Sequence, residues 1–212
     1  MNNEIYALGV GHNTPVFIDL AESCGYKIAG LYHYNSDRTG EKDHGFTIIG
    51  SFDDLLKNDL HGKSYLLTMG DNEIRRRLVN EIIVRGGSVP TLIHPTAVIS
   101  KFAKISDIGV YISAFTHVQA DSNIGEGTIL LSGVNISHNN KIGTYCFVAG
   151  GATVGAYTIV EDEVFIGQGA LSISGKVTVI GHKAYIGARS LITKSIKANS
   201  IVKGSPAKLI SD

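Results

Sequence analysis

From Ile112 onward, a large aliphatic residue returns at every sixth position of the chain. This aliphatic row consists of Ile112, Val118, Ile124, Leu130, Ile136, Ile142, Val148, Val154, Val160 and Ile166. Four positions after each member stands a second row, which consists of Thr116, Ser122, Thr128, Val134, Asn140, Cys146, Ala152, Thr158, Val164 and Ala170. A period of six with fixed slots predicts a triangular parallel β-helix, in which about 18 residues form one coil and stacked coils bury both rows.

The aliphatic row is interrupted after Ala170 and resumes at Ile180, so residues 172–179 are expected to contain a short loop inserted into one coil. Residues 194–210 are expected to leave the repeat and cap the β-helix. Glycine directly follows the aliphatic residue at four positions, Gly125, Gly143, Gly155 and Gly167. A tight corner of the backbone favours glycine, so we expect corners there.

Asn140 is the only member of the second row that is neither small nor β-branched, and it stands two positions after His138. One interpretation is a buried asparagine that backbone groups satisfy at a corner, without a chemical role. The other is a functional site, because local rules of sequence are most often broken there.

The first third of the chain alternates strand-like and helix-like segments, which predicts a small parallel sheet covered by helices. Strands are expected at residues 4–10 and 27–34, a short strand followed by a helix within residues 47–58, and a strand followed by a turn within residues 64–72. Thr14, followed by Pro15, is expected to cap a helix that extends to about Gly25. A second helix is expected to be capped near Ser51 or Asp53. In a third, Ile74, Leu78, Ile82 and Ile83 mark one apolar face. We therefore expect two domains, residues 1–92 and 93–212.

A parallel sheet binds ligands at the carboxyl ends of its strands, where helix N-termini offer N–H groups to anions. The turn GVGHNTP, residues 9–15, lies at such an end but has only part of the glycine pattern of a dinucleotide-binding turn. His12, at the entrance of the helix, is placed to meet a phosphate or a sugar hydroxyl.

Composition restricts the function further. The 19 basic and 19 acidic residues balance, which argues against a bulk electrostatic hold on nucleic acid or an anionic membrane. No apolar run approaches the roughly 20 residues of a membrane span, and the N-terminus lacks the pattern of a signal peptide. Two cysteines in unrelated contexts, Cys24 and Cys146, suggest reduced thiols in a cytosolic protein.

Several motifs occur in a fixed order: GVGH (9–12), IGSFDDL (49–55), GDN followed by Arg75 (70–75), IHPTAVIS (93–100), the hexads, and GSPAK (204–208). In this order the chain resembles the bacterial sugar acetyltransferases, among them the bacillosamine- and perosamine-pathway N-acetyltransferases and the sialic-acid O-acetyltransferases. The resemblance implies a Rossmann-like α/β domain for a nucleotide sugar, followed by an all-β left-handed parallel β-helix of hexapeptide repeats. It also implies a cytoplasmic homotrimer.

The resemblance implies a site as well. His138, before Ile142–Gly143, takes the place of the family's general base. It would help an amine on a nucleotide-linked 4-amino-4,6-dideoxy sugar to attack acetyl-CoA directly, without a metal. Asn139 stands where relatives carry an acidic residue, and its amide oxygen can still accept a hydrogen bond from the histidine Nδ1–H. Phe147 stands where a bacillosamine-type relative has a second histidine.

The remaining expected contacts follow from the same resemblance. The nucleotide sugar is expected at Gly11, His12, Tyr34, Asn35, Gly70 and Asn72. An acidic pair expected after the second strand is replaced by His33 and Tyr34, and Tyr34 can stack on a base. Acetyl-CoA is expected at Gly155, Gly167, Phe147, Lys203 and Lys208, with the two lysines near its phosphates.

Three alternatives stay open from the sequence. An O-acetyltransferase of the same fold would act on sialic acid or another sugar. A sugar-nucleotide-binding protein without catalytic activity would use His138 only structurally. A metal-dependent hydratase of the same helical type would need three converging histidines. The repeats offer only His117, His138 and His182, at spacings that do not suit one face of the coils.

Overall fold

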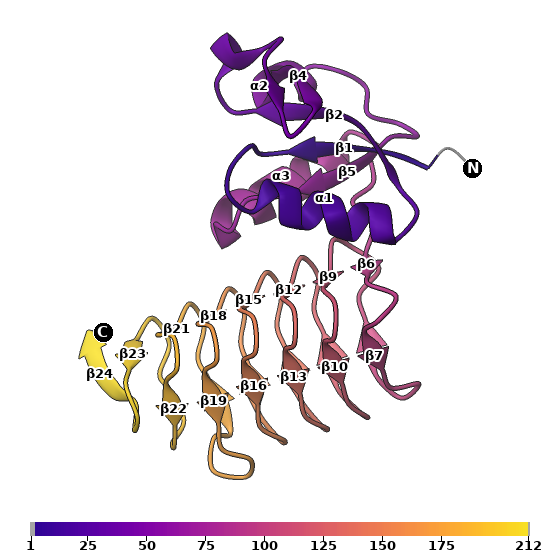
Figure 1. The fold of residues 1–212 in the computed structure, drawn as a ribbon. Coiled ribbons are helices and arrows are strands. Elements are labelled where there is room, and N and C mark those ends of the chain that lie inside the picture. The colour runs from indigo at the N-terminus through magenta and orange to yellow at the C-terminus, as the bar shows by residue number, and fades with distance from the viewer. Residues whose placement is uncertain (1–2, 212) are drawn as a thin grey trace. The chain divides into compact units, whose positions relative to one another are not determined.

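A computed structural model describes residues 3–211 of the chain. The chain divides into two compact units, Met1–Leu92 and Ile93–Asp212, and each is described by itself. The first unit is an α/β domain with one sheet, and the second is a stack of β-coils (Figure 1). Among residues 3–211, no helix is both long enough and apolar enough to span a bilayer.

The sheet of the first unit has five strands in the order β3-β4-β2-β1-β5. Their bounds are β1 Glu4–Leu8, β2 Lys27–His33, β3 Lys42–Asp43, β4 Phe46–Ser51 and β5 Ser64–Leu67. Strands β4, β2, β1 and β5 are parallel, as the alternation of segments predicted, and β3 pairs antiparallel with β4 at one edge. The sheet is closed to solvent at its centre, where Ile5, Ala7, Leu31, Ile48 and Leu66 are all buried.

Helices α1 (Thr14–Ser23), α2 (Phe52–Leu55) and α3 (Asn72–Val84) follow β1, β4 and β5, and the short helix η1 (Ser36–Arg38) follows β2. Ser51, one of the two residues expected to cap α2, is its N-cap and forms a capping box with Asp54. The hydrogen bond from the Ser51 side chain lowers the pKa of the Asp54 carboxyl. Asp71 caps α3 by accepting from the Ile74 N–H.

Two details of the predicted helices are wrong. Thr14 is the first residue of α1, so Asn13 is its N-cap, and the Thr14 hydroxyl is used in the preceding turn instead. In α3 the buried residues are Arg75, Leu78, Val79 and Ile82, whereas Ile74 and Ile83 are 41% and 39% exposed. The apolar pattern misplaced this face because a buried arginine occupies one of its positions.

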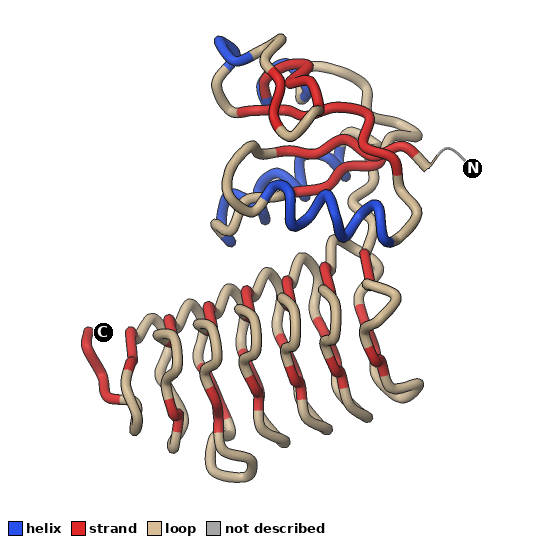
Figure 2. The backbone as a smooth tube through the Cα atoms, viewed as in Figure 1, coloured by secondary structure: helices blue, strands red, loops and turns tan. Residues whose placement is uncertain are grey.

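The strands of the second unit form three sheets, in which all pairs are parallel except β23 with β24. Figure 2 shows the coils stacked along the unit. Face one contains β6 (Leu92–Ile93), β9 (Tyr111–Ile112), β12 (Ile129–Leu130), β15 (Phe147–Val148), β18 (Phe165–Ile166), β21 (Tyr185–Ile186), β23 (Ile201–Lys203) and β24 (Lys208–Ser211). Face two contains β7 (Val98–Ile99), β10 (His117–Val118), β13 (Asn135–Ile136), β16 (Thr153–Val154), β19 (Leu171–Ser172) and β22 (Leu191–Ile192). Face three contains β8 (Lys104–Ile105), β11 (Asn123–Ile124), β14 (Lys141–Ile142), β17 (Ile159–Val160) and β20 (Val179–Ile180).

Both predicted rows of the repeat are buried inside the coils. The aliphatic residues from Ile112 to Ile166 are each at most 3% exposed, and the second row is buried throughout. Residues one coil apart pair with each other, as His117 does with Asn135 and Asn135 with Thr153. Across the predicted insertion one coil is two residues longer than the others, because Ile159 pairs with Val179. The inserted loop extends outward between β19 and β20 (Figure 1).

The corners of the coils lie elsewhere than the glycine pattern predicted. A left-handed backbone occurs directly before members of the second row, for example at Phe115, Gly127, Gly133 and Asn139. Gly155 is not among the residues with positive φ. Instead, a Cβ atom there would lie 2.5 Å from the Ser172 carbonyl oxygen, and at Gly167 2.5 Å from the Ala188 nitrogen. Glycine is needed after the aliphatic residue because adjacent coils approach too closely for a side chain.

The repeat also continues further than expected. Strand β23 pairs in parallel with β21, and Ile196 and Val202 fill the core of this last coil. Only after Lys203 does the chain leave the repeat, when β24 turns back and pairs antiparallel with β23. The prediction of a cap is therefore correct for residues after Lys203 and wrong for residues 194–203.

Candidate functional site

His138 lies on an exposed corner between β13 and β14. Its Nδ1 is 2.8 Å from Oδ1 of Asn139, the contact that the sequence predicted. Asn139 has a left-handed backbone with φ of 58°, a conformation that asparagine tolerates better than most residues. An amide oxygen only accepts hydrogen bonds, so this contact places the proton on Nδ1. It leaves Nε2 as the nitrogen that can take up a proton.

The next coil supplies a second neighbour of the imidazole. Tyr157 packs perpendicular to the His138 ring, with a centroid distance of 5.2 Å. Its backbone N–H also donates to the His138 carbonyl oxygen at 3.4 Å. Tyr157 was not among the residues predicted from the sequence. The six-residue repeat could have indicated it, because position 157 follows position 139 by one coil and therefore stacks on the corner that carries His138.

Asn140 is fully buried beside this corner, and its side chain is saturated by the backbone. Its Nδ2 donates to the carbonyl oxygens of Ser137 and Val154 at 2.8 and 3.3 Å. Its Oδ1 accepts from the Thr158 N–H at 2.7 Å. Ser122 reinforces the arrangement by donating to the same Ser137 oxygen at 2.8 Å. The structure thus shows Asn140 as a buried amide that joins two coils.

A hollow of about 400 Å³ lies at the carboxyl ends of β1, β2 and β5 in the first unit. Gly11, His12, Tyr34 and Gly70, all predicted for the nucleotide sugar, line it. Residues that the sequence analysis missed complete the lining, notably Asn13, Phe52, Thr68, Met69, Ile74 and Arg77. The hollow therefore has an apolar wall and one guanidinium.

The other two residues predicted for the nucleotide sugar make local contacts. Asn35 is the N-cap of η1, where its side chain accepts from the Asp37 N–H at 2.9 Å. The Asn72 Oδ1 accepts from the guanidinium of the buried Arg75 at 3.1 Å. Neither of these asparagines is in the lining of the hollow.

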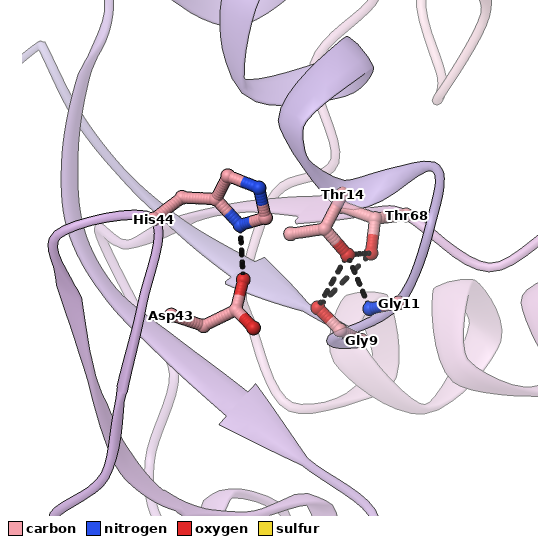
Figure 3. A network of polar contacts seen from close by, with 6 residues as sticks. All are labelled: Gly9, Gly11, Thr14, Asp43, His44 and Thr68. Atoms are coloured by element: carbon pink, nitrogen blue, oxygen red, sulfur yellow. Dashed lines mark hydrogen bonds and ion pairs between the residues drawn. The ribbon is translucent and has the colours of Figure 1, made fainter.

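Hydroxyl groups hold the turn at the entrance to this hollow (Figure 3). The Thr14 hydroxyl accepts from the Gly11 N–H at 2.9 Å and lies 3.1 Å from the Thr68 hydroxyl. Both hydroxyls donate to the Gly9 carbonyl oxygen. Gly9 has φ of 109°, and a Cβ atom there would lie 2.6 Å from the Thr68 Oγ1. The glycine of this turn is thus required by both conformation and space. Figure 3 also shows a separate contact, between His44 and Asp43.

The residues predicted for acetyl-CoA are distributed over several parts of the coils. Gly155 directly follows β16, one coil after the segment that carries His138, and Gly167 directly follows β18. Phe147 is on the outer side of face one, where its ring stacks on Phe165 at 5.5 Å. Lys203 and Lys208 lie opposite each other on β23 and β24.

Lys208 also lines a hollow of about 550 Å³ at the C-terminal end of the coils. Lys194 and Lys197 contribute two further positive charges to this hollow. Its floor is apolar, with Ile196, Val202, Ala207 and Leu209. Three ammonium groups beside an apolar floor suit a ligand that combines phosphates with uncharged parts.

The histidines of the coils occupy different positions. His94 directly follows β6 of face one, a position that the three predicted histidines did not include; His117 lies on face two, His138 on the corner after it, and His182 on the corner after face three. Within residues 3–211, no three histidine, cysteine, aspartate or glutamate side chains are grouped as metal ligands would be. Within residues 3–211, no disulfide joins Cys24 and Cys146, and the Cys146 thiol donates to the Glu161 carbonyl oxygen at 3.1 Å.

Comparisons with known proteins relate both units to one group. The family of the PglD N-terminal domain matches residues 4–82. The GDP-perosamine N-acetyltransferase of Escherichia coli O157:H7 is 29% identical over 192 residues, which cover 89% of this chain and 86% of the relative.

Solved structures agree over nearly the whole chain. Perosamine N-acetyltransferase from Caulobacter crescentus, in complex with CoA and GDP-perosamine, superimposes with a TM-score of 0.88 at 25% identity, covering 99% of this chain and 97% of the other. The acetyltransferase domain of PglB from Neisseria gonorrhoeae, in complex with acetyl coenzyme A, has a TM-score of 0.88 at 28% identity, covering 99% and 100%. Over nearly its whole length this chain is similar to sugar acetyltransferases with hexapeptide repeats. The similarity indicates that it is an acyltransferase, and its coils form a left-handed β-helix.

Proposed function

We propose that this acetyltransferase transfers the acetyl group of acetyl-CoA to the amine of a nucleotide-linked 4-amino-4,6-dideoxy sugar. The observation that carries the proposal is the exposed imidazole of His138, held through Nδ1 by Asn139 on a β-helix corner. The similar Caulobacter crescentus enzyme was solved with both CoA and GDP-perosamine, which supports these two classes of substrate. The reaction would belong to the synthesis of a surface polysaccharide or glycan precursor in the cytoplasm.

In the proposed reaction, His138 acts as general base through Nε2. The sugar nitrogen attacks the thioester carbonyl, a C–N bond forms, and Nε2 takes the proton of the amine. When the tetrahedral intermediate collapses, the C–S bond breaks and the same proton passes to the sulfur of CoA. Asn139 keeps Nδ1 protonated throughout, so that one nitrogen remains available for this proton.

The identity of the Nδ1 partner favours an amine over a hydroxyl as the acceptor. Asn139 offers an amide oxygen and no negative charge, so it orients the imidazole without stabilising imidazolium as a carboxylate would. A hydroxyl needs more help from the base than an amine needs. The second candidate is therefore O-acetylation of sialic acid or another sugar, and the third is binding of a sugar nucleotide without catalysis.

We assign the nucleotide to the hollow at the carboxyl ends of β1, β2 and β5. Its turn contains Gly11 and His12, and the N-terminus of α1 directs N–H groups toward the same region. Arg77 supplies the positive charge that a pyrophosphate requires, and the exposed Tyr34 supplies a ring for a base.

A panel of acceptors tests the proposal. Release of CoA from acetyl-CoA would be followed with GDP-, UDP- and dTDP-linked 4-amino-4,6-dideoxy sugars, and with sialic acid as the hydroxyl acceptor. We expect turnover with at least one of the amino sugars and none with sialic acid. Turnover with sialic acid alone would establish O-acetylation, and binding of the nucleotide sugars without CoA release would establish a non-catalytic protein.

For acetyl-CoA we predict an effect of the lysines at the C-terminal hollow. Changing Lys208 to glutamine should raise the KM for acetyl-CoA by up to about fivefold, the range of one exposed ion pair, with kcat unchanged. With 3′-dephospho-CoA as the carrier the penalty should shrink if Lys208 meets the 3′-phosphate. Lys27→Gln in the first unit is the matched control and should change nothing. An unaltered KM in Lys208→Gln would remove this lysine from the donor site.

We also propose that the enzyme is a homotrimer, since one exposed corner does not enclose two substrates. Apolar side chains on the outer side of face one support an interface, because Phe165 stacks on Tyr185 at 4.6 Å and Tyr185 and Ile201 are exposed. Light scattering at micromolar concentration should give three times the mass of the chain. The mass of a single chain would contradict the prediction.

A further inference from the structure

Tyr157 is an unfavourable residue for the position that it occupies. Its φ is 62°, in the left-handed region where a Cβ atom is strained. Equivalent corners of the coils carry glycine at Gly127, Gly133 and Gly151, and other residues at positions such as Phe115 and Asn139. The Tyr157 side chain is also 61% exposed, so burial of apolar area does not compensate for the strain. Neither the backbone conformation nor burial therefore favours a tyrosine at this corner.

The contacts of Tyr157 are directed at His138. Its ring is perpendicular to the imidazole, a favourable geometry for two aromatic rings, at a centroid distance of 5.2 Å. Its N–H donates to the His138 carbonyl oxygen at 3.4 Å, the backbone bond that successive coils repeat at other corners, as Tyr145 N–H does to the Glu126 oxygen, so the specific contact between the two residues is the one between their rings. The Asn139 bond holds Nδ1 from the same coil, and Tyr157 meets the ring from the next one.

We propose that Tyr157 is a positioning residue that holds the His138 imidazole in its reactive orientation. Asn139 is itself exposed, so its single bond to Nδ1 leaves the ring free to swing about the Cβ–Cγ bond. A perpendicular ring beside the imidazole removes that freedom and keeps Nε2 directed at the acceptor amine. The strain of a left-handed tyrosine is then the cost of this orientation. This role rests on the proposed function of His138 as the base.

Three variants separate positioning from folding. Tyr157→Phe keeps the ring and should keep kcat within about twofold of wild type. Tyr157→Gly removes the ring and relieves the strained φ, so the melting temperature should stay equal or rise while kcat falls about tenfold. The KM for both substrates should remain within about twofold. The matched control is Phe115→Gly, which removes another aromatic residue with left-handed φ (60°) from a different corner, 74% exposed. It should show the same gain in melting temperature and no change in kcat.

A kcat of Tyr157→Gly equal to wild type would overturn the proposal, as would an equal loss of kcat in Phe115→Gly. A rise in KM without a fall in kcat would also overturn it, because Tyr157 would then bind substrate rather than orient the base.

A measurement without substrate distinguishes this inference from the proposed function. Nitrogen-15 NMR of His138, assigned with His138→Ala, should show one tautomer with the proton on Nδ1 in wild type and in Phe115→Gly. In Tyr157→Gly the signals should move toward a mixture of both tautomers. If no acceptor of the panel is acetylated but the tautomers still mix, the proposed function fails and the positioning contact stands. If acetylation occurs and Tyr157→Gly changes neither kcat nor the tautomer, the positioning role fails alone.

Discussion

Replacing His138 with alanine should lower kcat by about 10²- to 10⁴-fold, the usual contribution of a positioned general base. The imidazole is exposed at its corner, so its removal should leave the fold and the melting temperature intact. Because the loss is confined to the transition state, the KM for acetyl-CoA and for the sugar nucleotide should change little. Steady-state kinetics with the acceptor found in the panel would measure both quantities.

A second substitution distinguishes a base from a group that merely holds the amine. His138→Asn keeps a hydrogen-bonding side chain but has no atom that accepts a proton at neutral pH. The general-base mechanism predicts that this variant is nearly as slow as alanine. If the amine arrived already deprotonated and needed only to be held, asparagine would support turnover. Activity of His138→Asn within threefold of wild type would end the assignment of His138 as base.

The β-helix could be predicted from the sequence because each of its slots is determined by local packing. Every coil buries the same positions, so the pattern is repeated from Ile112 to Ile166 and survives a few exceptions. The first unit gave a weaker signal. Its strands and their parallel order were predictable, but the buried face of α3 was not. Arg75 is buried on that face, whereas an arginine in a helix normally indicates a side exposed to solvent.

The reason for the glycines that follow the aliphatic row could not be predicted from the sequence either. Both a corner and a close approach of two backbones favour glycine, and one position in a sequence does not distinguish them. At Gly155 the structure shows the close approach, since Ser172 and Ser174 of the next coil are 2.5 Å from a Cβ atom. A bulky residue at Gly155 would therefore disturb the coils. The predicted role of Gly155 in binding acetyl-CoA needs a test that keeps the glycine.

Contacts of the site between residues that are neighbours in the sequence could be predicted, and contacts between residues far apart in the sequence could not. Asn139 adjoins His138 in the chain, so its hydrogen bond followed from the sequence. Tyr157 belongs to the next coil, and its contact depends on the stacking distance and on a left-handed corner. The hollow of the first unit combines ends of three strands, so only residues in the turn motifs were found, while Phe52 and Arg77 were not.

Asn140 should matter for stability through a single backbone group. Its Oδ1 accepts from the buried N–H of Thr158. The two carbonyl oxygens that its Nδ2 contacts have other donors, because the Ser137 oxygen also accepts from the Ser122 hydroxyl and the Val154 oxygen from the Ser137 N–H. In Asn140→Val the Thr158 N–H should lose its partner, at a cost of about 1–3 kcal/mol. Asn140→Thr is the matched variant, because Thr128 shows how a hydroxyl in this row accepts from the next coil, the Cys146 N–H, at 3.1 Å.

The two variants differ only in whether a hydroxyl is present, so their comparison isolates the hydrogen bond. Urea unfolding should place Asn140→Thr within about 1 kcal/mol of wild type and Asn140→Val below it. Hydrogen exchange should show protection of the Thr158 amide in wild type and in Asn140→Thr, and loss of that protection in Asn140→Val. Equal stability and equal protection in both variants would mean that the fold does not need a polar residue at this position. The break in the repeat beside His138 would then have to be explained by catalysis, and the kcat of Asn140→Val would be the quantity to measure.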